Sequence, residues 1–499
     1  MTESIRIEGR WIIYNKSDRD FRFEFSGMLL IRPGNKAVLI PDYDISDDFL
    51  TIFHYVKSGK VSDECNYSGN ITAEFSGMKN IPDIPLITGK GVSGSDITLT
   101  ENHFLTGISS DGINLSGNTG DENNGIIVPG IVIDGFRFEN CDEITFCTMI
   151  LFPDDFINWT KYDIYRKDFF KEYEEILIYS SDYFNLSISS FDLSGDKNSA
   201  TYNNAALIVR YPKEKKMNEI TDDLKIIQIF LSFMMDKPSF YWYIKGIHER
   251  EPLLSDYAGR KITDICSIYF SDSMLTNRKL IDYSGYGKFI VGFEEIKDNS
   301  GIYFSGWLNF FKNYESLTGL YFSVVFNPEM YRENKFLAFV ECLEIYHRKS
   351  GNFRNYLIEP GEYEERINTV KKVLGENKIF TKKIRESIVN TLKFGNKPNL
   401  ENRLNDLCYF FRDYLILYID DYENFSSDVS VNRNYIVHRE AKKGFSYADG
   451  FELEKLVVLL ELLIHLIFLY EAGFDAEFIH RYPEKFIRMR YNKVNQHKR

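Results

Sequence analysis

The stretch LVVLLELLIHLIFLY, residues 456–470, is the most apolar run of the chain and decides how its C-terminal half folds. It is shorter than the roughly 20 residues that a membrane-spanning helix needs, and it contains Glu461 and His465. We therefore expect a helix that is buried in a bundle or in an interface. Because Glu461 and His465 are four residues apart, they can face each other on this helix, and we expect an internal hydrogen bond between them.

Helical patterns also fill the rest of residues 304–499. Gly375 and Gly395 close two of the expected helices. The stretch 399–419 places its apolar residues on one stripe of a helix. We expect an all-α bundle of about five or six helices. The stretches are ENKFLAFVECLEIYHRKS (333–350), GEYEERINTVKKVLG (361–375), TKKIRESIVNTLKFG (381–395) and NLENRLNDLCYFFRDYLILYI (399–419).

Residues 1–303 have a different pattern and hold most of the 32 glycines. Clusters of β-forming residues alternate there with Gly, Ser, Asn and Asp turns, for example IRIEGRWII (5–13) and DITLTENHFL (96–105). One helix, near residues 221–235, is expected to start with Thr221 as N-cap. The fold class is therefore multidomain α+β. A β-rich domain, sandwich-like or closed as a barrel, spans residues 1–303, and a helical domain spans residues 304–499.

Two loops of the N-terminal half carry weak motifs. GKGVSG, residues 89–94, has the letters of a dinucleotide-binding motif, but strand-like SDITLT follows it instead of a helix, so we expect a β-turn. The acidic stretch 109–125 lacks the ligand spacing of a calcium loop, so we expect a flexible surface loop that is able to serve in recognition.

Composition narrows the functional classes. The net charge is −13, whereas proteins that coat nucleic acid non-specifically are usually basic, so any contact with nucleic acid must be local. Six cysteines and eight histidines are scattered without a CxxC pair, so we expect no metal site, no cofactor and reduced thiols. The N-terminal MTESIRIEGRW has no apolar core of a signal peptide, so we expect a cytoplasmic protein without membrane attachment.

The stretch NRNYIVHRE, residues 432–440, holds the main candidate site residues, Arg433, Asn434 and His438. We expect the preceding DDYENFSSDVSV (420–431) to form a polar loop. A helix of about three turns should then begin at Ser430 or Asn432 and end at Gly444.

On such a helix the three residues do not all converge. Asn434 and His438 are four apart and point the same way, whereas Arg433 lies about 140° around the helix from His438. Two helices related by a dimer axis would bring Arg433 of one copy to His438 of the other. A histidine moves protons near neutrality, and an arginine binds phosphate with paired donors. Together they suit metal-free RNA cleavage, in which a 2′-hydroxyl attacks the adjacent phosphate.

A second polar cluster lies in ECLEIYHRK, residues 341–349. Glu344, His347 and Arg348 are spaced to share one helix face. The stretch is not an HExxH motif, so it does not indicate a zinc protease. A salt-bridged helix face and a functional role remain open for this cluster.

The combination resembles HEPN ribonucleases, whose mark is Arg, a polar residue, a few residues and His, late in a helical bundle and before a strongly apolar helix. The wider layout is similar to ApeA-type bacterial anti-phage proteins. The resemblance implies abortive infection by an endoribonuclease, with tRNA as a known target class and a phage-encoded trigger sensed by the N-terminal half. It also implies that Arg433 and His438 are catalytic, that Asn434 helps them, that Glu344 is a supporting residue, and that the active enzyme is a homodimer or a higher assembly.

The tail RYPEKFIRMRYNKVNQHKR, residues 481–499, is basic and aromatic, which fits either a local RNA-binding surface or a solvated helix end. Two other functions stay open besides the endoribonuclease. The first is a non-catalytic HEPN-type adaptor with a ligand-binding β half, and the second is a carbohydrate-binding sandwich fused to a dimerisation bundle.

Overall fold

The structure, a computed structural model, divides into two compact units between Gly301 and Ile302, two residues before the predicted boundary. We call them the N-terminal and C-terminal units. The predicted recognition loop at 109–125 lies outside the described residues. The structure describes residues 5–14, 22–31, 37–42, 81–91, 95–105, 126–138, 141–161, 175–192, 203–250, 262–270, 289–327, 329–377, 379–439 and 447–496.

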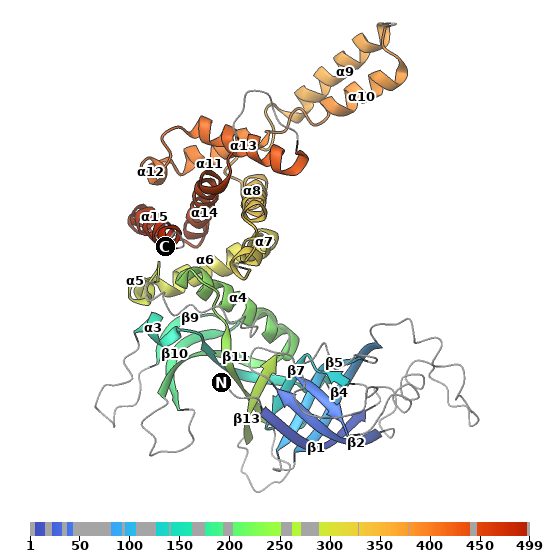
Figure 1. Cartoon of the computed structure of the whole chain (residues 1–499), viewed down its shortest axis with the longest axis vertical. Coiled ribbons are helices and arrows are strands. Elements are labelled where there is room, and N and C mark those ends of the chain that lie inside the picture. Colours follow the sequence, from blue (N-terminus) through green and yellow to red (C-terminus); the bar gives the residue numbers. More distant parts are fainter. Residues whose placement is uncertain are drawn as a thin grey trace, which may run out of the picture. The chain divides into compact units, whose positions relative to one another are not determined.

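The N-terminal unit is built on one continuous antiparallel sheet of 13 described strands, in the order β4-β1-β2-β3-β6-β5-β7-β13-β12-β8-β11-β10-β9 (Figure 1). This confirms the predicted β-rich class. The strands are β1 Ile5–Tyr14, β2 Arg22–Ile31, β3 Val38–Pro41, β4 Ile81–Gly91, β5 Asp96–Leu105, β6 Ile126–Val128, β7 Ile131–Asp134, β8 Thr145–Pro153, β9 Ile176–Ser180, β10 Asn185–Asp192, β11 Asn203–Lys216, β12 Tyr241–Arg250 and β13 Ile262–Phe270.

The first six strands close into a ring, because β4 pairs with both β1 and β5. Trp11 is fully buried in the core of this ring and donates its indole N–H to the carbonyl of Gly27 at 3.0 Å. Gly89 of the GKGVSG motif faces the same indole, since a Cβ there would lie 2.3 Å from a ring carbon of Trp11. The first glycine of the motif therefore serves strand packing in β4, while residues 92–94 lie outside the described residues.

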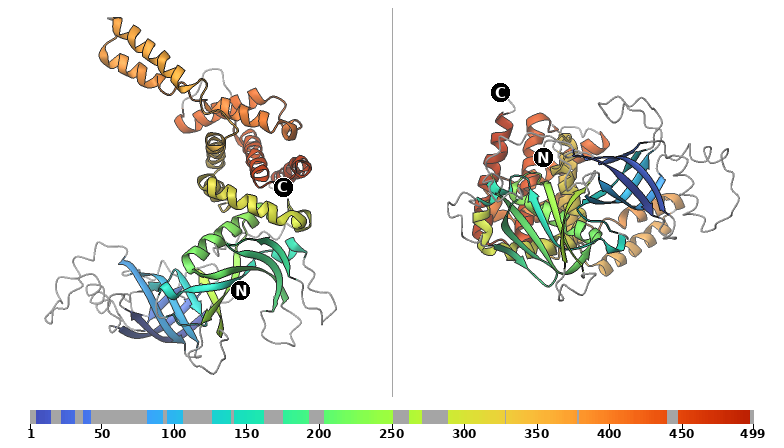
Figure 2. Two further views of the ribbon diagram at one scale, coloured as in Figure 1. Left: turned by 180° about the vertical axis from the view of Figure 1, so that it is seen from behind. Right: turned by 90° about the horizontal axis from the view of Figure 1, so that it is seen from below.

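The remaining strands form an open, curved sheet against which helix α4 (Met217–Met235) packs through β8 and β11 (Figures 1 and 2). The predicted helix is present but begins four residues before Thr221. Thr221 is not its N-cap, because its hydroxyl donates to the carbonyl of Met217 at 2.8 Å from inside the helix. An ion pair between Lys215 and Asp223 at 2.8 Å fixes α4 to β11. The described part of this unit also holds two short α-helices, α3 (Phe156–Thr160) and α5 (Phe293–Ile296), and two 3-10 helices, Cys141–Glu143 and Lys297–Asn299.

The C-terminal unit is helical, as predicted, but its described part holds more helices than the expected five or six. Residues 399–419 form two helices instead of one. The helices are α6 Ser300–Asn313, which starts at the boundary, α7 Glu315–Val325, α8 Arg332–Lys349, α9 Pro360–Glu376, α10 Lys382–Leu392, α11 Leu400–Phe410, α12 Arg412–Leu415, α13 Tyr422–His438, α14 Gly450–Glu471 and α15 Ala476–Gln496. None of the described helices is long and apolar enough to cross a membrane.

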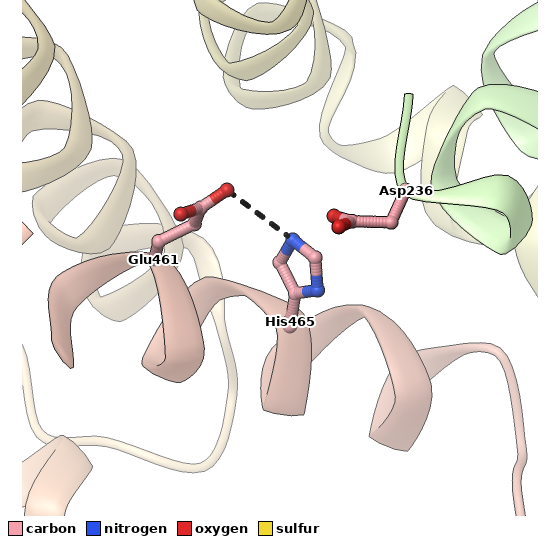
Figure 3. Close-up of side chains that lie close together, drawn as sticks. All are labelled: Asp236, Glu461 and His465. Carbon is pink, nitrogen blue, oxygen red and sulfur yellow. Dashed lines mark ion pairs between the residues drawn. The ribbon is translucent and has the colours of Figure 1, made fainter. Parts of the chain in front are cut away.

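Helix α14 contains the apolar run 456–470 and is buried along most of its length, packing on α8 and α15. Figure 3 shows Glu461 and His465 on one face of α14. Nε2 of His465 lies 4.0 Å from Oε1 of Glu461. That is too long for the predicted hydrogen bond. His465 instead contacts the hydroxyls of Tyr321 and Tyr482, each at 2.5 Å, and Glu461 accepts two bonds from Arg490, at 2.9 and 2.7 Å. Every buried polar group here has a partner from another helix, which explains how α14 tolerates them.

Candidate active site on helix α13

Helix α13 is longer than the sequence indicated and carries all three main candidate residues. The stretch 420–431 is helical from Tyr422, so the predicted polar loop is wrong. Asp421 is the N-cap, because its carboxylate accepts the backbone N–H of Asn424 at 3.0 Å. At the other end α13 stops at His438, six residues before Gly444, because Arg439 adopts a left-handed conformation with φ 57°.

Arg433, Asn434 and His438 all lie toward the C-terminal end of α13. Arg433 is partly buried, whereas Asn434 and His438 are exposed. The guanidinium of Arg433 donates to the side-chain oxygen of Asn434 at 3.2 Å, so these two residues form a contiguous polar surface. In the described part of the chain, no hydrogen bond or ion pair joins Arg433 to His438. One chain therefore presents the pair without closing it, as the helical spacing predicts.

Asn432, which the sequence reasoning treated only as a possible cap, holds the end of α13 in place. It is 4% exposed, and its amide donates to the carbonyl of Asp428 at 2.8 Å while its oxygen accepts the N–H of Ala448 at 2.8 Å. Tyr435 and Tyr447 stack beside it, with ring centroids 3.9 Å apart. These two links fasten the segment that precedes α14 to the turn of α13 that carries the candidate residues, so the surface around His438 is built on a fixed backbone.

Glu344 is not brought to Arg433 or His438 by any described hydrogen bond or ion pair. It accepts a bond from Arg348 at 2.8 Å, one turn further along α8. The neighbouring His347 is completely buried, and Arg403 of α11 donates to its Nδ1 at 2.9 Å. Because Nδ1 accepts, Nε2 carries the hydrogen that binds the carboxylate of Asp406 at 2.8 Å. His347 therefore clamps α8 to α11, the helix on which α13 packs.

The clamp makes stability depend on pH. Burial lowers the pKa of His347 below its ordinary value of 6.5, and the positive charge of Arg403 acts in the same direction, although the hydrogen bond to Asp406 opposes them. As the pH falls below about 6.5, His347 is therefore protonated in the unfolded chain before it is protonated in the folded chain. We expect the contribution of His347 to the free energy of unfolding to be fully present above that pH and to be lost as the pH falls below it. Urea denaturation between pH 5 and 8 measures this, and a His347→Gln variant should show a shallower slope. If the free energy of unfolding of the variant changes with pH as steeply as that of the unmodified protein, His347 does not cause the pH dependence.

Helix α13 carries the groups that cleavage of a phosphodiester needs, but in one chain these groups point in different directions. A solvent-exposed imidazole is able to exchange a proton with a bound substrate, and a guanidinium next to an amide oxygen is able to bind a phosphate oxygen. The remaining requirement is that both groups reach the same phosphate, which the separation around α13 opposes in a single chain.

Comparison with known families assigns this helical unit. The family model described as Apea-like HEPN matches residues 337–478, which include most of α8 and all of α13 and α14. The C-terminal unit is thus a HEPN domain, a class whose members are typically ribonucleases.

The N-terminal half identifies the particular family. The model described as ApeA N-terminal domain 1 matches residues 6–307, more than half of the chain. The chain belongs to the ApeA family of HEPN proteins, which is associated with anti-phage defence. No curated protein and no solved structure matches it significantly.

Proposed function

We propose that this protein is an anti-phage endoribonuclease that acts by abortive infection in the bacterial cytoplasm. The observation that carries the proposal is the Arg433-Asn434-x-x-x-His438 constellation at the fixed, exposed end of α13, within a HEPN domain of the ApeA family. The HEPN domain, residues 304–499, cleaves RNA, with tRNA as the first substrate to test. Residues 1–303 respond to a phage-encoded trigger and control the nuclease.

The reaction is a transesterification within the RNA. His438 removes the proton of a 2′-hydroxyl, whose oxygen attacks the adjacent phosphorus. The bond from phosphorus to the 2′-oxygen forms, the bond to the 5′-oxygen breaks, and the leaving oxygen takes up a proton. Arg433 binds the phosphate oxygens and stabilises the charge that develops on them, while Asn434 holds Arg433 in place. The products end in a 2′,3′-cyclic phosphate and a 5′-hydroxyl.

This chemistry uses an arginine from one copy and a histidine from another, because the two diverge on one helix. A homodimer or a larger assembly through the HEPN domain is therefore part of the proposal. The basic surface of α15, which includes Arg481 and Arg488, lies in the same unit and is able to bind phosphates outside the reacting position.

The test is whether cleavage needs a metal. We expect the purified full-length protein to cut tRNA or total RNA in the presence of EDTA, and we expect the new 3′ ends to carry cyclic phosphates. End-specific ligation and sequencing distinguish these ends from 3′-hydroxyls. A requirement for a divalent ion, or products with 5′-phosphates, would contradict the mechanism.

A further inference from the structure

Arg439, the residue that follows His438, ends α13 and is exposed. Its backbone has a φ of 57°, in the left-handed region that favours glycine, and its N–H donates to the carbonyl of Tyr435 at 2.7 Å. The backbone of Arg439 therefore closes the helix without help from the side chain. The guanidinium is available for another purpose.

An aromatic pair supports this guanidinium. Its central carbon lies 6.0 Å from the ring centroid of Tyr435, within the range of a cation–π contact. The ring of Tyr435 is itself stacked on that of Tyr447, with centroids 3.9 Å apart, and both tyrosines are half-buried. The charged group of Arg439 is thus exposed but has a fixed surface beneath it.

Arg439 is placed beside the row that Asn434 and His438 form on α13. Successive helix residues are 100° apart, so Tyr435 lies about 60° around the helix from His438, whereas Arg433 lies about 140° away in the opposite direction. The guanidinium over Tyr435 therefore borders His438 on the side away from Arg433. Within the described residues, no hydrogen bond or ion pair joins Arg439 to a carboxylate, so its charge is able to bind an anion from outside the chain.

A phosphate bound next to His438 requires a nearby positive charge. His438 is the last residue of α13, and the C-terminal end of a helix carries a partial negative charge that repels anions. A neutral imidazole that acts as a base does not offset this repulsion. Because Arg433 of the same chain diverges from His438, Arg439 is the arginine at this end of α13 that is placed to offset it. Its planar guanidinium binds phosphate oxygens with paired N–H donors.

We propose that Arg439 binds an RNA phosphate adjacent to the one that reacts, in the same chain as His438, and that Tyr435 holds its guanidinium in position. This assignment rests on the proposed function and deepens it, since it adds a substrate-binding residue to that site. The role differs from that of Arg433, which reaches the reacting phosphate from the second copy.

The test compares Arg439→Gly with the unmodified residue in a full-length chain that also carries His438→Ala, so that RNA is bound but not cut. Glycine removes the guanidinium and suits the left-handed backbone, so the melting temperature should be unchanged or higher. We expect labelled tRNA, followed by fluorescence anisotropy in EDTA, to bind about 10-fold more weakly. The slope of log Kd against log salt concentration should decrease by about 0.7 to 0.9, the change for one lost phosphate contact. Arg439→Lys, which keeps the charge, should keep the slope.

The matched control is Arg412→Ala. Arg412 is also exposed, and its carbonyl accepts the hydroxyl of Tyr422, the first residue of α13. It therefore lies at the opposite end of a helix that is about 25 Å long. This variant should bind tRNA with unchanged affinity and an unchanged slope.

Three results would overturn the proposal. The first is normal affinity and slope in Arg439→Gly, and the second is a loss that the control shares or that accompanies a lower melting temperature. The third is weaker self-association in sedimentation with an unchanged slope, which would mean that Arg439 binds a carboxylate of the second copy. If the unmodified protein cleaves RNA while Arg439→Gly binds it normally, only this assignment is wrong. A chain that neither binds nor cleaves RNA overturns the proposed function as well.

Discussion

Replacing His438 by alanine is expected to slow RNA cleavage by about 100- to 10,000-fold, the range that a lost general acid or base produces. His438 is exposed at the last residue of α13 and makes no hydrogen bond in the described structure, so the substitution should leave folding unchanged. The rate is measured as single-turnover cleavage of tRNA in EDTA, and the fold is checked by circular dichroism. Phage protection in cells should fall with the rate.

The matched control is His480→Ala. His480 is an exposed histidine of α15 in the same unit, and its ring lies 6.2 Å from that of Tyr414. It should keep the full cleavage rate. If the His438 variant still cleaves RNA at the normal rate, the site assignment is wrong. If purified protein cleaves no RNA and the variant still protects cells, the non-catalytic adaptor, one of the two alternatives that the sequence left open, replaces the nuclease.

The division into a β-rich and a helical half was predictable because it depends on local composition. Glycine-punctuated strands and helical apolar stripes are properties of short segments. Closure of the ring is different, because it requires β4 to pair with β1 across some 70 intervening residues, and the alternating pattern of each strand fits several neighbours. The sequence therefore left a sandwich and a barrel open.

The ends of α13 were mispredicted for a related reason. The buried face of α13 includes the polar residues Ser426 and Asn432 next to Phe425 and Val429, so its sequence looked like a loop. Asp421 was a recognisable N-cap, and Phe425, Val429 and Asn432 have helical spacing, so this signal was present but weak. The partners of Asn432 and His347 could not be predicted, since Ala448 and Asp406 are brought to them only by tertiary packing.

Mixing two inactive chains is expected to restore cleavage. If Arg433 and His438 act across a two-fold axis, then a dimer of one Arg433→Ala chain and one His438→Ala chain has one site with both substitutions and one site with none. Random exchange makes half of the dimers mixed, each with one intact site of two, so the activity should reach about a quarter of normal. The measurement is cleavage after the two variants are co-expressed under different affinity tags, or mixed and allowed to exchange.

The restored activity distinguishes a site that two chains share from a site within one chain, because the two arrangements predict different activities for the mixture. If both residues of one site came from the same chain, every site in the mixture would lack one group, and activity would stay at the level of the single variants. Recovery should also depend on association, so the mixture should lose activity on dilution below the dimer dissociation constant. A chain that carries both substitutions, mixed with either single variant, is the control and should restore nothing. The mixing experiment therefore tests directly whether Arg433 and His438, which diverge on α13, act together across two chains.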